Sequence, residues 1–176
     1  FSPDDKVRLE PCHPVPAGIA LAFDQPWEGN TSAYASLFED NGRYRMYYRG
    51  SAGSDYADKA MLTPGEKLPT AHPEFTCYAE SSNGITWEKP KLNRHAFAGS
   101  KANNILLADS ATHNFAPFLD TNPAASSESR YKAVAANKRV LMAYQSADGM
   151  DWRPLQSEPI LTDGYFDSLN LAFWSD

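Results

Sequence analysis

Hydrophobic and polar residues alternate with a period of two in several short stretches of the chain, which is the pattern of β-strands. The clearest case is "RYRMYYRG" (43–50), where Tyr44, Met46 and Tyr48 share one face. Its arginines share the opposite face, which we expect to be solvated. A second stretch, "RYKAVAAN" (130–137), has the same layout. No helical period of useful length accompanies these strands, so the pattern predicts an all-β protein.

A second repeated pattern lies after each of these strands. "ESSNGITWEKP" (80–90) and "QSADGMDWRPL" (145–155) both read Ser-x-(Asn/Asp)-Gly-x-x-Trp. Asn-Gly and Asp-Gly favour type I′ hairpin turns, because both central residues of such a turn need positive φ. We therefore predict two tight hairpins, and we interpret Trp87 and Trp152 as packing anchors.

These segments combine into two four-stranded meanders. The expected strands are 34–40, 43–50, 75–81 and 85–90 in the first repeat, and 115–120, 130–137, 140–146 and 150–155 in the second. An insertion at about 51–74 is rich in Gly, Pro and charge, which predicts a loop. Near the end, "YFDSLNLAFWSD" (165–176) resembles the opening "AFDQPWEGNTSAYASLFED" (22–40), so a third copy begins there.

Antiparallel four-stranded units repeated at roughly 60–65 residues are typical of β-propeller blades. We predict one partial propeller domain over residues 1–176, with about two and a half blades. Its repeats span about 22–92 and 113–161, and a third starts at 165–176. A ring needs more blades than this. We favour a fragment of a longer propeller, with blades from other chains as the alternative.

Charge and composition exclude several classes of partner. The net charge of −6 and the pI near 5.2 disfavour nucleic acid and anionic membrane surfaces. No run approaches the roughly 20 apolar residues that span a bilayer. Phe1 at the start indicates a processed, trimmed or engineered chain. Cys12 and Cys77 lack the spacing of a zinc site, and either a disulfide or two thiols fits them. We expect a secreted or periplasmic protein.

Three segments resemble a known group of enzymes. "FDQPWEGN", "HNFAPFLD" and "GYFDSLNLAFW" look like the five-bladed propeller glycoside hydrolases, which are the arabinanase, β-xylosidase and fructosidase group of families 43, 32 and 68. The closest resemblance is to family-32-like N-terminal domains. It covers nearly the whole chain through loose motifs, and it implies a five-bladed propeller that hydrolyses plant or microbial polysaccharides or oligosaccharides.

The resemblance also implies catalytic carboxylates at the mouth of a central funnel. Asp24 would be the base or nucleophile, and Asp167 a second acid or a transition-state-stabilising group. Glu28 is the nearest candidate for the general acid. The middle repeat departs from the family's pattern, because it offers His113 and Asn114 where a third carboxylate is expected. Glycosidic cleavage needs one carboxylic acid to protonate the leaving oxygen and one carboxylate as base or nucleophile.

Several other residues are candidates for contact with a sugar. They are Trp27, His113, Asn114, Asn170, Trp174 and Arg49. Indole faces stack on sugar rings, and partial burial among aromatic side chains raises the pKa of a general acid. We expect no cofactor and no catalytic metal. A structural calcium ion in the funnel, as in some arabinanases, is left open by the sequence.

Two other functions compete with hydrolysis. The first is a noncatalytic propeller that binds glycans or another protein, because the middle repeat lacks an acid. The second is a sialidase-like protein, since "SSNGITW" is one residue short of the sialidase Asp-box. The position of the acids separates them: hydrolysis is favoured if Asp24 and Asp167 face one cavity, and binding is favoured if they do not.

Overall fold

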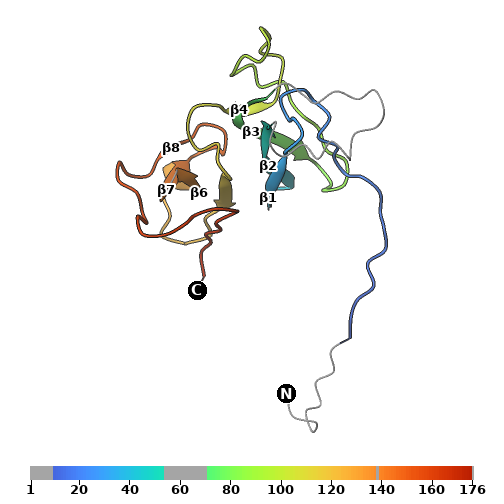
Figure 1. Cartoon of the computed structure of the whole chain (residues 1–176). Coiled ribbons are helices and arrows are strands. Elements are labelled where there is room, and N and C mark those ends of the chain that lie inside the picture. Colours follow the sequence, from blue (N-terminus) through green and yellow to red (C-terminus); the bar gives the residue numbers. More distant parts are fainter. Residues whose placement is uncertain (1–9, 54–70, 138, 176) are drawn as a thin grey trace.

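The computed structural model describes residues 10–53, 71–137 and 139–175, and these residues form two four-stranded antiparallel sheets (Figure 1). The first sheet has the order β1 (Ala33–Asp40), β2 (Arg43–Ala52), β3 (His72–Ser81) and β4 (Ile105–Leu107). The second has the order β5 (Ala116–Leu119), β6 (Tyr131–Asn137), β7 (Val140–Ser146) and β8 (Arg153–Pro154), with a 3₁₀ turn at Ser127–Ser129. The prediction of an all-β chain of four-stranded meanders is confirmed.

The fourth strand of the first sheet is not where the sequence predicted it. Segment 85–90 makes one isolated bridge, between Glu80 and Glu88, and the chain then leaves the sheet. It returns as β4, where Ile105 and Leu106 are buried beside β3. Two adjacent apolar residues fill this edge better than a segment that contains Glu88 and Pro90. The first sheet therefore reaches Leu107, beyond the predicted repeat boundary.

The two repeated turns share one hydrogen-bond pattern, but the type I′ prediction is wrong. Gly84 and Gly149 have positive φ (72° and 75°), whereas Asn83 and Asp148 do not. The Ser81 hydroxyl accepts from the Asn83 and Gly84 amides, and Asn83 Oδ1 accepts from the next two amides. Asp148 repeats this arrangement with Ser146. Side-chain acceptors therefore shape these turns.

A turn with two left-handed residues does occur between β1 and β2. Asn41 has φ 52° and Gly42 has φ 78°. This two-residue Asn-Gly loop matches the twist of the strands that it joins.

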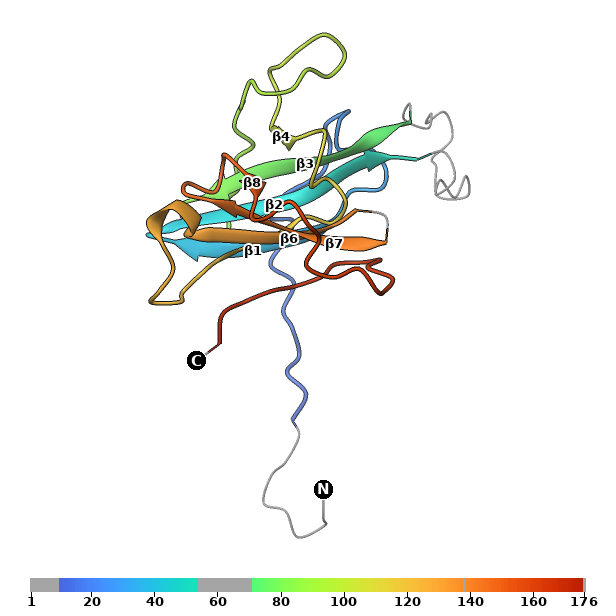
Figure 2. The same cartoon turned by 90° about the vertical axis from the view of Figure 1, so that its left-hand side faces the viewer.

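The main core lies between the two sheets, whose strands run in similar directions (Figure 2). Tyr47 of β2 is fully buried there and packs against Phe115 and Trp152 of the second repeat. Its hydroxyl donates to Gly149 O at 2.8 Å, and Arg45 Nη1 donates to Asp148 O at 2.7 Å. The prediction that the arginine face of β2 is solvated is thus wrong for Arg45, because this face packs on the second sheet.

A second set of hydrogen bonds joins the two sheets at the end of β1. Asp40, which is 6% exposed, accepts hydrogen bonds from Arg130 and from the Tyr131 hydroxyl. Burial alone would raise the pKa of Asp40, but these donors outweigh it and lower the pKa.

The outer faces of the sheets have their own clusters. Trp27 and Trp87 pack on the far face of the first sheet around Tyr48 and Cys77. On the second sheet, Ala116, Val134 and Leu141 are covered by Phe166, Leu169 and Ala172. Among residues 165–175 no strand forms, so the expected third copy is an extended cover over this face. The packing role of both repeated tryptophans is confirmed, with Trp152 between the sheets.

Cys12 is exposed, Cys77 is buried, and no disulfide joins them. Across the part of the chain that the structure describes, no helix has the length and apolar character needed to cross a membrane. Most of the loop predicted at 51–74 lies outside the described residues; its first two residues continue β2, and its last three begin β3.

Candidate functional site

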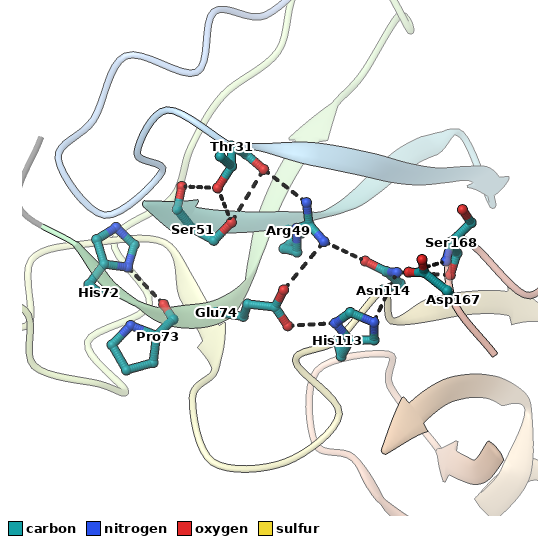
Figure 3. A network of polar contacts seen from close by, with 10 residues as sticks. All are labelled: Thr31, Arg49, Ser51, His72, Pro73, Glu74, His113, Asn114, Asp167 and Ser168. Atoms are coloured by element: carbon teal, nitrogen blue, oxygen red, sulfur yellow. Dashed lines mark hydrogen bonds and ion pairs between the residues drawn. The ribbon is translucent and has the colours of Figure 1, made fainter. Parts of the chain in front are cut away.

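A polar cleft of about 620 Å³ lies where the start of each repeat meets the end of β2 and the start of β3. Its volume is in the range of sites for small ligands. Side chains that can donate or accept hydrogen bonds line it, and Figure 3 shows many of them in one network. The polar and aromatic lining consists of Thr31, Ser32, Tyr34, Arg49, Ser51, His72, Glu74, His113 and Asp167.

Arg49, near the end of β2, is the centre of this network. Its Nη1 donates to Asn114 Oδ1 at 3.0 Å and lies 3.3 Å from Glu74 Oε1. Its Nη2 donates to Thr31 O at 3.2 Å, and its guanidinium lies 4.7 Å from the centroid of the Tyr34 ring. The side chain is only 16% exposed. A buried guanidinium with this many partners holds three separate chain segments in fixed positions.

A carboxylate–imidazole pair lies beside Arg49. Glu74 Oε2 is 2.8 Å from His113 Nδ1, so the carboxylate accepts from this nitrogen. The other imidazole nitrogen, Nε2, is 3.4 Å from Asn114 Nδ2. The carboxylate partner assigns the proton to Nδ1 and leaves Nε2 as an acceptor in the neutral ring. His113 and Glu74 come from different repeats and are 38% and 31% exposed, so both reach the cleft.

The backbone is left-handed at the start of each of the three repeats. Tyr34, Asn114 and Ser168 have φ of 56°, 54° and 66°. Tyr34 and Asn114 are equivalent, since each lies six residues before the aspartate at the end of its repeat's first strand, which is Asp40 within β1 and Asp120 directly after β5. Such backbone is uncommon outside glycine and is concentrated at functional sites. All three residues belong to the Arg49 network, because Asn114 Nδ2 donates to Ser168 O at 2.8 Å.

Asp167 lines the same cleft from the third segment. Its Oδ1 accepts from the Ser168 amide at 2.8 Å, and the residue is exposed (Figure 3). By position it precedes a left-handed residue, as His113 does, so its structural equivalents are His113 and Ala33. Asn170 donates to Phe166 O within its own segment, and Trp174 is 42% exposed; neither lines the cleft.

The other two candidate acids lie elsewhere. Glu28 is fully buried and accepts from Tyr48 and from Lys89 Nζ, which lies 2.8 Å away. Asp24 is exposed and 3.0 Å from the same ammonium. Hydrogen bonds from Gln25 and Lys89 lower the pKa of Asp24. Neither acid lines the cleft, and the contacts of Glu28 anchor the segment before β1 to the core.

Trp27 belongs with this anchoring segment. Its Nε1 donates to Asn104 Oδ1 at 2.6 Å, and its ring packs edge-on to Phe97. It does not line the cleft. Of the residues predicted to bind or act on a sugar, the structure thus brings together Arg49, His113, Asn114 and Asp167.

Sequence reasoning missed Glu74 and Tyr34. The sequence pattern predicts a loop at Glu74, but the residue belongs to β3. Thr76 pairs with Arg49, and Glu74, two residues before Thr76, lies on the same face of the strand. The alternation along β3 was the available signal. Tyr34 was included in a strand, and no pattern in the sequence reports a left-handed backbone at a tyrosine.

Among residues 10–53, 71–137 and 139–175, no three His, Cys, Asp or Glu side chains are grouped so as to hold a metal ion.

Comparison with known proteins gives a distant likeness. No family model and no curated protein matches this chain. A solved structure described as a "putative glycoside hydrolase" from Parabacteroides distasonis is similar to 73% of this chain, with 15% identity and a TM-score of 0.41. The chain spans about a third of that protein's length, since the match covers 33% of it. A likeness this low assigns neither a family nor an activity.

Proposed function

We propose that this chain is the glycoside-binding part of a β-propeller glycoside hydrolase, and that Asp167 and Glu74 are its paired carboxylates. One observation supports this best: two carboxylates from different repeats line one cleft, with the imidazole of His113 beside them. Paired carboxylates across a sugar-sized cleft are what glycosidic cleavage requires. The two sheets would be consecutive blades of a five-bladed ring, and the start of each blade would face the central funnel.

The contacts of the two acids suggest different roles. Glu74 is already engaged by Arg49 and His113, so it is held in one orientation. Asp167 is exposed and accepts from a backbone amide, which leaves its second oxygen available to a substrate. In this proposal Asp167 acts directly on the sugar as base or nucleophile. His113 acts as the general acid in its doubly protonated form, giving the proton on Nε2 to the leaving oxygen, while Glu74 accepts from Nδ1 and stabilises the imidazolium before the transfer.

A panel of aryl arabinofuranosides, aryl xylosides and fructans tests the proposal with three variants. Asp167→Asn and Glu74→Gln should each lower kcat by at least about 100-fold, as loss of acid–base catalysis does. Asp24→Asn is the matched control, because Asp24 lies outside the cleft, and its kcat should stay within about threefold of the wild type. Retained turnover in Asp167→Asn, or its loss in Asp24→Asn, would overturn this assignment.

A noncatalytic glycan-binding function is the second candidate. It is favoured by the engagement of both Glu74 oxygens with Arg49 and His113, because a carboxylate held in this way can accept from a ligand hydroxyl group without taking part in catalysis. Binding of the same sugars without turnover, unchanged in Asp167→Asn, would select this function over hydrolysis.

A further inference from the structure

Tyr34 occupies a backbone position that other residue types would occupy more easily. Its φ of 56° is left-handed, and a bulky aromatic residue in this region is a genuine outlier. Asn tolerates this conformation best among residues with a side chain, and Asn114 is found at the equivalent position of the second repeat. The first repeat therefore keeps an aromatic ring at a conformational cost, which indicates a role beyond shaping the turn.

The ring is not needed to hold its neighbour in place. Arg49 lies over one face of it, but Arg49 also contacts Asn114, Glu74 and the Thr31 carbonyl. Three other partners would keep the guanidinium in position without the ring. Tyr34 depends more on Arg49 than Arg49 does on Tyr34, because the guanidinium covers one face of the ring and so fixes its orientation.

Tyr34 is also placed to meet a ligand. It lines the cleft beside Glu74, His113 and Asp167 and remains partly exposed. These three side chains offer hydrogen-bond acceptors at the edges of the cleft, while Tyr34 offers a flat apolar surface. A molecule with an apolar face and a rim of hydroxyl groups fits this combination.

We infer that Tyr34 is the aromatic platform on which the sugar ring of a ligand stacks, with the ring's hydroxyl groups directed to Glu74, His113 and Asp167. The inference rests on the proposed function, since it takes the ligand to be a glycoside. It assigns a binding role to a residue in the bulge between Ala33 and Ser36, where the left-handed backbone would suit Gly or Asn better than an aromatic residue.

Two substitutions separate the platform from a structural role. Tyr34→Asn removes the ring but suits the left-handed backbone, so its thermal unfolding midpoint should equal or exceed that of the wild type. Its affinity for the aryl xylosides and arabinofuranosides, measured by calorimetry, should fall about tenfold or more, as expected for loss of an aromatic contact. Tyr34→Phe is the matched control, and it should keep both stability and affinity within about twofold.

Each other result contradicts the inference. Wild-type affinity in Tyr34→Asn shows that nothing stacks on the ring, and failure of this variant to fold shows that the ring is structural. A wild type that binds none of these glycosides also overturns it. Binding without turnover defeats the hydrolase proposal alone, and the comparison of Tyr34→Asn with Tyr34→Phe then still decides the platform.

Discussion

The two sheets have the same strand order, but the matching faces of their second strands differ in chemistry. In β2, Arg45, Tyr47 and Arg49 contact the second repeat. Each donates a hydrogen bond to it, and the Tyr47 ring also packs against it. The positions 87 residues further on, the offset that relates Arg43 to Arg130, are Lys132, Val134 and Ala136 in β6. Val134 packs in an apolar cluster with Ala116 and Leu141, which side chains of the last segment cover.

This difference explains why, among the described residues, the Arg49 network has no counterpart at the equivalent positions of β6. The meander sets where strands lie, whereas the side chains on one face decide whether a polar network can be built. Ala136 occupies the position of Arg49 and has no group that could join neighbouring segments. The same strand arrangement thus carries a polar network on this face of β2 and an apolar contact on the equivalent face of β6.

The largest expected effect is at the centre of the two faces. Tyr47→Ala should lower the free energy of unfolding by about 3–5 kcal/mol, because it removes a fully buried ring and leaves a cavity between the sheets. Val134→Ala, at the equivalent position, should cost only about 1–2 kcal/mol. Urea denaturation measures both. Equal losses would show that the two faces contribute alike and would remove the contrast.

A second pair of equivalent residues tests the ties at the strand ends. Asp40→Asn should cost about 2 kcal/mol, because Asp40 joins the two sheets through Arg130 and Tyr131. Asp120→Asn should cost about 1 kcal/mol, because its ionic partner, Lys132, lies in the same sheet. Urea titrations at neutral pH compare the two, and a larger loss for Asp120→Asn would contradict this ranking.

The lowered pKa values of Asp40 and Asp120 predict that the protein loses folding stability in acid. Burial opposes ionisation of both, but for Asp120 the Lys132 ammonium and the Asn122 amide outweigh it, so its pKa is lowered, as for Asp40. A pKa lowered on folding contributes stability that is present above the ordinary value of 3.8 and is lost as the pH falls through the folded-state value. Each Asn variant should therefore lose less stability than the wild type between neutral pH and pH values below 3.8.

The smallest effect concerns the repeated turns. Burial would raise the pKa of Asp148, but the Asp151 and Met150 amides outweigh it and lower the pKa. Asn83 makes the same contacts without a charge. Asp148→Asn should thus cost less than about 1 kcal/mol at neutral pH, and Asn83→Asp should stabilise by a similar amount. Below pH 3.8 both differences should shrink, which thermal unfolding at two pH values checks.

The strands were predictable because their signal is local. Alternation in 43–50 and 130–137 and the Gly turns at Gly84 and Gly149 located six of the eight strands closely. The fourth strand of the first sheet was not predictable, because Ile105–Leu107 is a strand of three apolar residues with no alternation. Its position depends on the edge of β3, which exists only after folding.

The site was predictable in part. His113, Asn114 and Asp167 begin their repeats, and the resemblance to propeller hydrolases implied that such positions meet at a central funnel. Asp24 and Asp167 both follow a phenylalanine, and this likeness suggested an equivalence that the backbone does not repeat. The left-handed backbone at these positions depends on tertiary contacts, so it could not be predicted from the residue types.

The short outer strands have a consequence for how copies of this protein meet one another. An exposed sheet edge is a template for pairing with another chain, and long flat edges lead to aggregation. Here the outer edges are β4, with three residues, and β8, with two residues of which one is Pro154. The inner edges, β1 and β5, lie against each other. Within the described residues, neither outer strand is therefore long enough to serve as a long template for pairing with a second molecule.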